Sequence, residues 1–122
     1  MQFYDHYLRP AGIRSTQYGL MRCIAALPEP FISDIGRVLS MDQTTVTRNI
    51  EKLERAGFVE TGPHPDDPRK KRVALSQKGL QKVEEARPYW QQAQDAIRAR
   101  IGEENLERLL GLLSELSATT KI

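Results

Sequence analysis

Hydrophobic residues recur at helical spacing through most of the chain and alternate with polar residues in only two short stretches. In the first third, an apolar residue returns every three or four positions, which is typical of one face of a helix. This stripe consists of Leu20, Cys23, Ile24 and Leu27. Pro10 and Gly12 lie ahead of it, and the sequence PEP at 28–30 lies behind it. Because proline and glycine end helices, the pattern predicts helices over 2–9 and 15–27.

Two further helices are predicted close together in the centre of the chain. Ser33 is placed to cap a short helix that ends before the linking sequence SMD at 40–42. Asp42 is placed to cap the next helix, expected over 42–56, and Gly57 follows as the glycine that ends it. The apolar positions of the two helices are Ile35, Val38, Leu39, Val46, Ile50 and Leu53. Two helices joined by so short a turn are typical of a helix-turn-helix.

Alternation marks the stretches 59–61 and 72–75, which flank a proline-rich segment and predict a two-stranded antiparallel hairpin with a long loop. Two helices complete the chain. Ser76 is placed to cap the first of them, Pro88 inside it predicts a kink, and Gly102 separates it from the second. The apolar residues of this pair are Leu80, Val83, Trp90, Ala93, Ile97, Ile101, Leu106, Leu109, Leu110, Leu113 and Leu116.

The order of elements predicts a mainly α fold with a small two-stranded antiparallel β wing. In this interpretation residues 15–75 form a winged helix-turn-helix, and residues 1–14 and 76–122 form flanking dimerisation helices within one compact domain. The last two helices carry more apolar surface than so small a core can cover, and such a patch is a liability when exposed. A second copy related by a two-fold axis is the natural cover, so we expect a homodimer.

Composition excludes several classes of protein. The 122 residues amount to one domain, and no apolar run approaches the length of about 18 residues that predicts a membrane span. The N-terminal residues lack the cationic and apolar segments of a secretory signal. Cys23 is the single cysteine, so a disulfide within the chain is excluded and a cytoplasmic setting is expected. No nucleophile, paired-carboxylate or phosphate-loop motif is present, so we expect neither an enzyme nor a cofactor.

Charge is distributed unevenly along the chain, although the net charge is only +2. Residues 33–82 hold ten Lys and Arg against seven Asp and Glu, whereas residues 83–122 hold five against seven. Four cations are consecutive, from Arg69 to Arg72, in the loop of the predicted hairpin. A local basic patch is a candidate site for phosphate, and a solvated charged face is the alternative.

The position of the helix over 42–56 favours DNA as the partner. In a helix-turn-helix the second helix enters the major groove, and its N-terminal residues reach base edges. The outward-facing residues near this N-terminus are Gln43, Thr44, Thr45, Thr47 and Arg48. Gln pairs with adenine, Arg with guanine, and Thr with a hydrogen-bonding partner or the thymine methyl group. Three threonines weaken a helix unless function compensates, which favours recognition over the alternative of a plain polar surface.

The hairpin loop, expected as a wing over 62–72, is suited to the minor groove of DNA. Its prolines make it stiffer than a loop of glycine and serine. Arginine is well matched to the enhanced negative potential of a narrow minor groove. We expect Asp67 to orient Arg69, the candidate for the minor-groove contact. Attraction to phosphate is enough to explain Lys70 and Lys71.

Several single residues invite a functional interpretation. His6 and His64 match no metal-ligand spacing, and His64 is interpreted as a wing residue near phosphate. Cys23 lies on the apolar stripe, which favours a buried core residue over a redox sensor. Trp90 and Tyr89 are candidates to line a ligand site, but packing on a long helix is the simpler interpretation.

Three segments together resemble the MarR family of transcriptional regulators: GIRSTQYGLM, ISDIGRVLSMDQTTVTRNIEKLERAGFV and DPRKKRVALSQKG. The resemblance covers roughly residues 3–118. It implies a homodimer that binds pseudo-palindromic, double-stranded operator DNA, with the N-terminal and the last two helices at the dimer interface. It also implies a repressor whose DNA affinity falls when a small phenolic or aromatic effector binds or when a cysteine is oxidised.

Individual positions match the pattern of the family. Asp67 and Arg69 resemble the Asp-x-Arg pair of the wing, in which the arginine is the minor-groove residue, and Arg72 matches the second basic position. Ser33 and Lys52 fall where members of the family commonly touch phosphates. The resemblance therefore extends the set of candidate DNA contacts beyond the helix over 42–56.

The sequence departs from the family pattern near its start. Arg14 occupies the place where the family usually has a Thr or Ser cap, and we expect Ser15 to take over the capping. The first helix is shorter than is usual in the family. Cys23 lies in the second helix, away from the N-terminal position of the best-known peroxide-sensing cysteine of the family.

A winged helix used as a protein-protein interaction module, without DNA binding, is the alternative function. This alternative predicts an apolar or acidic exposed face on the helix over 42–56. The sequence shows a polar and basic face there instead, so DNA binding is the preferred interpretation.

Overall fold

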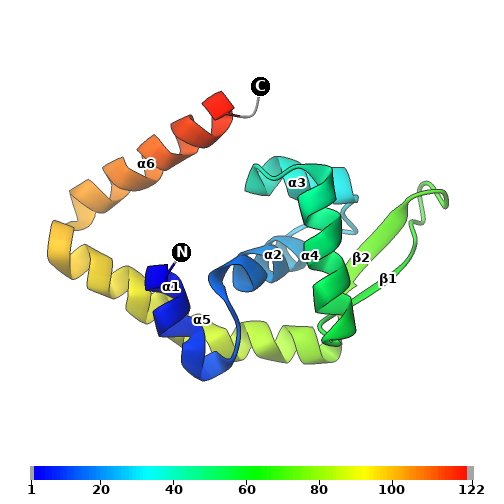
Figure 1. Ribbon diagram of the computed structural model, residues 1–122, viewed down its shortest axis with the longest axis horizontal. Helices are drawn as coiled ribbons and strands as arrows, with labels where there is room; N and C mark the ends of the chain where they lie inside the picture. The colour runs from blue at the N-terminus through cyan, green and yellow to red at the C-terminus, as the bar shows by residue number, and fades with distance from the viewer. Residues whose placement is uncertain (1, 121–122) are drawn as a thin grey trace.

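The computed structural model describes the backbone of residues 2–120 and the side chains of residues 2–112, and it is mainly helical (Figure 1). The chain begins with α1 (Gln2–Leu8), the 3₁₀ helix η1 (Arg9–Ala11), α2 (Ser15–Ala26) and α3 (Ile32–Leu39). It continues with α4 (Gln43–Arg55), β1 (Val59–Pro63), β2 (Lys71–Leu75), α5 (Gln77–Ile101) and α6 (Glu103–Thr120). The predicted mainly α fold with a two-stranded antiparallel wing is confirmed.

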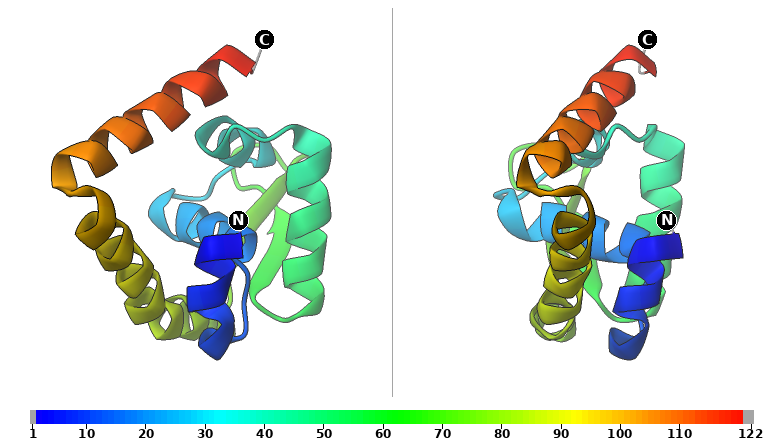
Figure 2. Two further views of the ribbon diagram at one scale, coloured as in Figure 1. Left: turned by 60° about the vertical axis from the view of Figure 1, so that its left-hand side comes forward. Right: turned by 90° about the vertical axis from the view of Figure 1, so that its left-hand side faces the viewer.

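The helix-turn-helix and the hairpin form a body on which the long helix α5 packs (Figure 1). Within this body α2 contacts α3, α5 and β2, while α4 contacts α3 and β1. α1 packs against α5. α6 follows α5 at a sharp angle, on the side of the molecule away from the hairpin (Figures 1 and 2). The wing and α6 are therefore at opposite sides of the body.

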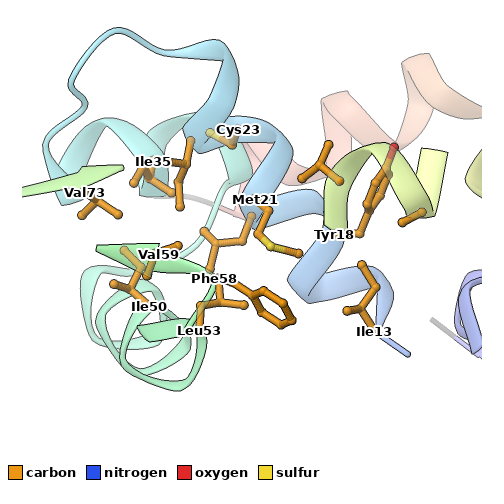
Figure 3. Packing of buried hydrophobic residues seen from close by; sticks show 14 of the residues in the cluster. Ile13, Tyr18, Met21, Cys23, Ile35, Ile50, Leu53, Phe58, Val59 and Val73 are labelled. Atoms are coloured by element: carbon orange, nitrogen blue, oxygen red, sulfur yellow. The ribbon is translucent and has the colours of Figure 1, made fainter. Parts of the chain in front are cut away.

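The hydrophobic core is built around α2, whose predicted apolar stripe is largely confirmed. The buried residues of α2 are Tyr18, Leu20, Met21, Cys23 and Ile24. They pack in one cluster with residues of α3, α4 and both strands (Figure 3), among them Ile35, Val46, Ile50, Leu53, Val59 and Val73. Full burial of one such side chain contributes about 1.5–3 kcal/mol, so this cluster holds the helix-turn-helix and the hairpin together.

Two predicted apolar positions, one on α3 and one at the start of α5, face solvent instead of the core. Val38 is 60% exposed and Leu80 is 47% exposed. The inward positions in the first half of α5 are occupied by small or medium residues, namely Gly79, Val83 and Ala86. α5 meets the backbone of Phe58 closely at Gly79, while the neighbouring Leu80 faces solvent.

The predicted N-terminal caps of α4 and α5 are confirmed. The Asp42 carboxylate accepts a hydrogen bond from the Thr45 N–H at 2.7 Å. The Ser76 hydroxyl accepts one from the Gly79 N–H at 3.0 Å. Both bonds satisfy backbone donors that have no partner within the helix.

The predicted caps at Ser33 and Ser15 are wrong. α3 begins one residue before Ser33, and the Asp34 carboxylate reaches back to accept the Phe31 N–H at 2.9 Å. α2 begins at Ser15 itself, whose N–H donates to the Asp5 carboxylate of α1 at 2.7 Å. Asp5 thus caps α2 from another helix, while the Gln17 side chain of α2 itself accepts the Arg14 N–H at 2.9 Å.

The hairpin is longer than its alternating pattern predicted. Its antiparallel register runs from Val59 opposite Leu75 to Pro63 opposite Lys71. Pro63 lies at the last rung of β1, where the missing N–H of proline is tolerated. The strands therefore carry the wing loop further from the core than the pattern indicated.

α5 continues through Pro88 as one helix over Gln77–Ile101. Proline removes one backbone hydrogen bond and clashes with the preceding turn, so it bends a helix. The ribbon of α5 changes direction along its length (Figure 1), which agrees with the predicted kink. Although α5 is long, neither it nor another helix in the described part of the chain is apolar enough to cross a membrane.

The first turn of α5 is packed directly on the backbone at Phe58. α4 ends in a Schellman motif, in which Gly57 has a φ of +82° and the Phe58 N–H donates to the Leu53 C=O at 2.9 Å. The Phe58 C=O accepts the Ser76 N–H at 2.9 Å. A Cβ atom at Gly79 would lie 2.0 Å from the same oxygen, so glycine is required there.

Replacing Gly79 with Ala should destabilise the fold strongly. The added methyl group would collide with the Phe58 carbonyl, and overpacking of this kind costs about 1–3 kcal/mol or more. Gly19→Ala is the matched control, because Gly19 also lies in a helix but has no atom within 4 Å of its Cβ position. Helix propensity should make that change neutral or stabilising by up to ~1 kcal/mol.

Chemical denaturation followed by circular dichroism, at one protomer concentration, measures both variants. Equal free energies of unfolding for Gly79→Ala and Gly19→Ala would show that the close contact at Phe58 is absent in solution.

Candidate nucleic-acid interface

The outward face of α4 carries the predicted recognition residues. Gln43, Thr44 and Arg48 are exposed, whereas Thr45 and Thr47 are half-buried at the edges of this face. A shallow hollow on the surface of α4 is lined by Gln43, Thr44, Thr47, Arg48 and Glu51. The hollow offers amide, hydroxyl and guanidinium groups together, which are the groups that read base edges.

The first turn of α4 is fixed through the backbone of Thr45. Its N–H is bound by Asp42, and this hydrogen bond holds the pKa of the Asp42 carboxyl below its usual range. Its C=O accepts a hydrogen bond from the Asn49 amide at 2.9 Å. The neighbouring side chains of Gln43 and Thr44 remain exposed, so the turn is rigid while its contact groups face outward.

The tip of the wing is a β-turn over residues 67–70. The Lys70 N–H donates to the Asp67 C=O at 2.9 Å, and Pro68 occupies the second position, where its fixed φ suits the turn. The Asp67 carboxylate accepts the Arg69 N–H at 3.2 Å, its Nε at 3.1 Å and its Nη2 at 3.3 Å. The Arg69 side chain is nevertheless 90% exposed. Asp67 therefore orients the guanidinium as expected without burying it.

A second hollow, of about 400 Å³, lies where the wing faces the starts of α3 and α4. It is lined by Phe31, Ile32, Ser33, Gln43, Arg69, Lys70 and Lys71. Two helix N-termini and three cations border it, so its electrostatic potential favours an anion. The fold thus brings Ser33, Gln43 and the wing cations together, although they are far apart in sequence.

The predicted contact residues Arg72, Lys52 and Asp67 line neither hollow. Arg72 is half-buried on β2, opposite Gly62. Lys52 is exposed near the C-terminal end of α4. Asp67 is half-buried at the wing tip, where its carboxylate is engaged by Arg69.

His64 lies in the wing as predicted, but its ring is buried and is not available to a phosphate. Its side chain is 2% exposed. Its Nε2 lies 2.7 Å from the Glu29 carbonyl oxygen, and its ring stacks on Phe31 with 3.8 Å between centroids. These partners are more than 30 residues away in the sequence, and no local pattern pointed to them.

Cys23 and Trp90 are packing residues in the structure. Cys23 is buried, and burial raises the pKa of its thiol. Trp90 is half-buried beside Tyr18, and the Arg22 guanidinium lies 4.5 Å from the centroid of its ring. This cation–π contact links α2 to α5. Among the described residues, no group of three His, Cys, Asp or Glu side chains is placed to hold a metal ion.

Replacing Arg69 with Ala should raise the pKa of the Asp67 carboxyl toward its usual range. Hydrogen bonding to the Arg69 side chain is the main reason that this pKa is lowered, followed by the bond from the Arg69 N–H. Asp42 is the internal control, because its lowered pKa depends chiefly on the Thr45 N–H. A titration followed by carboxyl-carbon NMR measures both groups.

Both carboxyl pKa values are lowered in the folded protein, so each carboxylate stabilises the fold above its ordinary pKa, and this stabilisation is lost as the pH falls. An unchanged Asp67 titration in Arg69→Ala would show that the ion pair is not formed in solution.

Comparisons with known proteins agree with this geometry. The sequence model of the MarR family matches residues 13–71, which include the helix-turn-helix and the wing loop. The fold is similar to that of the M. tuberculosis transcriptional regulator MosR in complex with DNA, with a TM-score of 0.83 and 29% identity; the match covers 99% of this chain and 89% of that one.

Two more distant structures share the fold. A mutant MarR from E. coli complexed with operator DNA has a TM-score of 0.83 and 24% identity, and the match covers 94% of this chain and 83% of that one. CouR from Rhodococcus jostii RHA1 bound to p-coumaroyl-CoA has a TM-score of 0.79 and 18% identity, with 95% and 82% covered. The matched helix-turn-helix and wing loop, together with a fold match over nearly the whole chain, show that residues 13–71 form a winged helix-turn-helix segment of the MarR type.

Proposed function

We propose that this protein is a homodimeric transcriptional regulator that binds double-stranded operator DNA sequence-specifically and acts as a ligand-responsive repressor. α4 enters the major groove and the wing reaches the adjacent minor groove. The observation that carries the proposal is the wing tip, where Asp67 holds an exposed Arg69 beside Ser33 and Gln43. MosR and MarR, which share this fold, have been crystallised with DNA.

The exposed side chains of α4 supply direct readout of bases. Gln43 and Thr44 lie in its first turn, from which side chains reach base edges in this geometry. Arg48 lies on the same exposed face, and arginine forms paired hydrogen bonds with guanine, as glutamine does with adenine. Thr45 and Thr47 flank this face and are placed for contacts with a thymine methyl group or a phosphate.

The wing and the start of α3 supply the contacts that fix the protein on the DNA backbone. Arg69 enters the minor groove, where a narrow groove concentrates negative potential. Lys70, Lys71 and Ser33 border the electropositive hollow and bind phosphates on either side of that groove. The remaining phosphate contacts are assigned to Lys52 and Arg72.

Exposed apolar residues at the end of α5, on α1 and on α6 favour a two-fold interface. In the single protomer these residues are between 37% and 63% exposed, and they are Phe3, Ile101, Leu109, Leu110 and Leu112. The sequence predicted that Leu113 and Leu116 also belong to this surface, but they lie outside the residues whose side chains the structure describes. Pairing two copies covers the patch. It also presents two copies of α4 to successive major grooves, which requires a pseudo-palindromic operator.

The effector of the proposed repressor is a small phenolic or aromatic compound. CouR, with the same fold, has been crystallised with p-coumaroyl-CoA, which carries a phenolic ring. We assign no cofactor and no catalytic role to the chain, because the candidate site offers contact groups for DNA and not a nucleophile with its base. A protein that binds operator DNA is expected in the cytoplasm, which fits the setting expected from the sequence.

A protein-protein interaction module without DNA binding is the competing function. It requires an apolar or acidic exposed face on α4. The apolar residues of α4 are buried in the core. Its exposed charged residues are three cations and two acids, namely Arg48, Lys52, Arg55, Glu51 and Glu54. This basic and polar surface favours nucleic acid over an apolar protein partner.

Replacing Arg69 and Arg72 together with Ala should weaken DNA binding and flatten its dependence on salt. Each cation that displaces counterions from B-DNA, whether at a phosphate or in the minor groove, contributes about 0.9 to the slope of log K against log salt concentration, so the slope should fall by up to ~2. Fluorescence anisotropy with a duplex enriched from a random-sequence pool measures both quantities. Arg87→Ala is the control, because Arg87 lies exposed on α5 and is paired with Glu84.

The two parts of this experiment test different claims. If the parent protein enriches no duplex from the pool, DNA binding itself is refuted and the interaction module is favoured. If a duplex is enriched but the double variant binds it as tightly as the parent, DNA binding stands and the role of the wing is refuted.

Replacing Leu109 and Leu112 together with Glu should convert the dimer into monomers. Both leucines are exposed on α6 in the single protomer, and burying a carboxylate at a two-fold interface is strongly unfavourable. Sedimentation equilibrium measures the oligomeric state, with Glu107→Gln on the same helix as the control. A dimer that survives the double substitution would place the interface elsewhere.

A further inference from the structure

We propose that His64 is a positioning residue for DNA recognition. Its ring connects the wing tip with the loop between α2 and α3 through Glu29 and Phe31, a contact called the latch below, and so fixes the direction of Arg69. The inference rests on the proposed DNA-binding function. It is carried by a buried histidine whose two ring nitrogens and ring face are all engaged, on an element that otherwise extends away from the core.

Both nitrogens of the His64 ring make hydrogen bonds to backbone groups. Nδ1 accepts the Asp66 N–H at 3.0 Å, so it carries no proton. Nε2 must then carry the proton, and it donates to the Glu29 C=O at 2.7 Å. Only the neutral ring in this one tautomer makes both bonds. The ring therefore joins the wing, through Asp66, to the α2–α3 loop, through Glu29.

The face of the same ring is engaged by Phe31. The two rings are stacked, with 3.8 Å between centroids and 20° between planes. The Lys70 Nζ lies 5.1 Å from the centroid of the Phe31 ring, a cation–π contact from the turn at the wing tip. Phe31 is also the residue at the start of α3, where Asp34 binds its N–H. The contact thus connects the wing with the helix that carries Ser33.

The backbone of the α2–α3 loop is shaped to meet His64. Glu29 has a φ of +43°, a left-handed conformation that is uncommon for residues other than glycine. It precedes Pro30, and a residue before proline prefers an extended backbone. A residue held in such a conformation indicates that surrounding contacts maintain it. The Glu29 carbonyl oxygen is the group that accepts the hydrogen bond from His64.

The latch acts on Arg69 through the backbone of the wing tip. The His64 N–H donates to the Lys70 C=O at 2.9 Å, and the Lys70 N–H closes the turn on Asp67 at 2.9 Å. Arg69 lies inside this turn. Without the ring, the tip keeps these two bonds but loses the hydrogen bond to Glu29 and the stacking on Phe31 that hold it to the body. It would then have to be ordered during binding, and ordering a mobile loop lowers affinity.

The test compares three substitutions at His64 in the full chain. His64→Leu removes both ring hydrogen bonds, His64→Gln keeps a donor for Glu29, and His64→Asn keeps an acceptor for Asp66. We expect His64→Leu to lower affinity for the enriched duplex by about tenfold, with smaller losses for Gln and Asn. His6→Leu is the control, because the other histidine of the chain is exposed on α1.

A double-mutant cycle with Arg69→Ala separates positioning from a general loss of stability. If His64 acts by placing Arg69, then His64→Leu should have little further effect on affinity in the Arg69→Ala background. Circular dichroism establishes that each variant is folded at the temperature of the binding measurement. If His64→Leu does not fold, the same double-mutant cycle is measured with His64→Gln and His64→Asn.

Each outcome has one meaning. Partial rescue by Gln or Asn, with an effect that vanishes in Arg69→Ala, supports the latch. Parental affinity in all three His64 variants, or an equal loss with and without Arg69, overturns it while leaving DNA binding intact. If the parent protein enriches no duplex, the proposed function fails, and the latch fails with it.

Discussion

The carbonyl group of Phe58 is the point at which the recognition helix, the wing and the long helix α5 are fixed relative to one another. Its oxygen accepts the Ser76 N–H, and Gly79 packs against it without a side chain, while the Phe58 N–H closes the end of α4. The Lys78 Nζ adds a hydrogen bond to the Ala56 C=O at 2.8 Å, which places a cation at the negative end of the α4 dipole. Because α5 leads to the proposed dimer interface, a rotation of α5 would move α4 and the wing together.

The wing is held at two levels along its length. Its base is fixed by the hydrogen bond from the Ser76 N–H, after β2, to the Phe58 C=O, before β1. Its tip contacts the α2–α3 loop through His64 and Phe31. An exposed hairpin of this length would otherwise lose much conformational entropy on binding DNA. The two attachments, with a proline inside the turn at 67–70, reduce that cost and give an exposed arginine a defined direction.

The candidate site combines contacts that are local in sequence with contacts that only the fold creates. Asp67 and Arg69 are two residues apart, and their ion pair follows from the turn that contains them. The electropositive hollow is different, because Ser33, Gln43 and Lys71 come from three separate elements. Each of them is an ordinary polar residue in isolation. Because all three line the same hollow, together they make the surface suitable for the phosphate backbone.

The sequence by itself determined the order of the helices, the caps of α4 and α5, the glycine that ends α4 and the pairing of Asp67 with Arg69. These features depend on helical periodicity and on hydrogen bonds between residues a few positions apart, so the residues that cause them are neighbours in the chain. Tertiary structure decided that Asp5 caps α2, that Leu80 faces solvent and that His64 is buried. Two of the partners of His64, Glu29 and Phe31, lie in a distant loop. On α5 it is Gly79, not Leu80, that meets the backbone of Phe58.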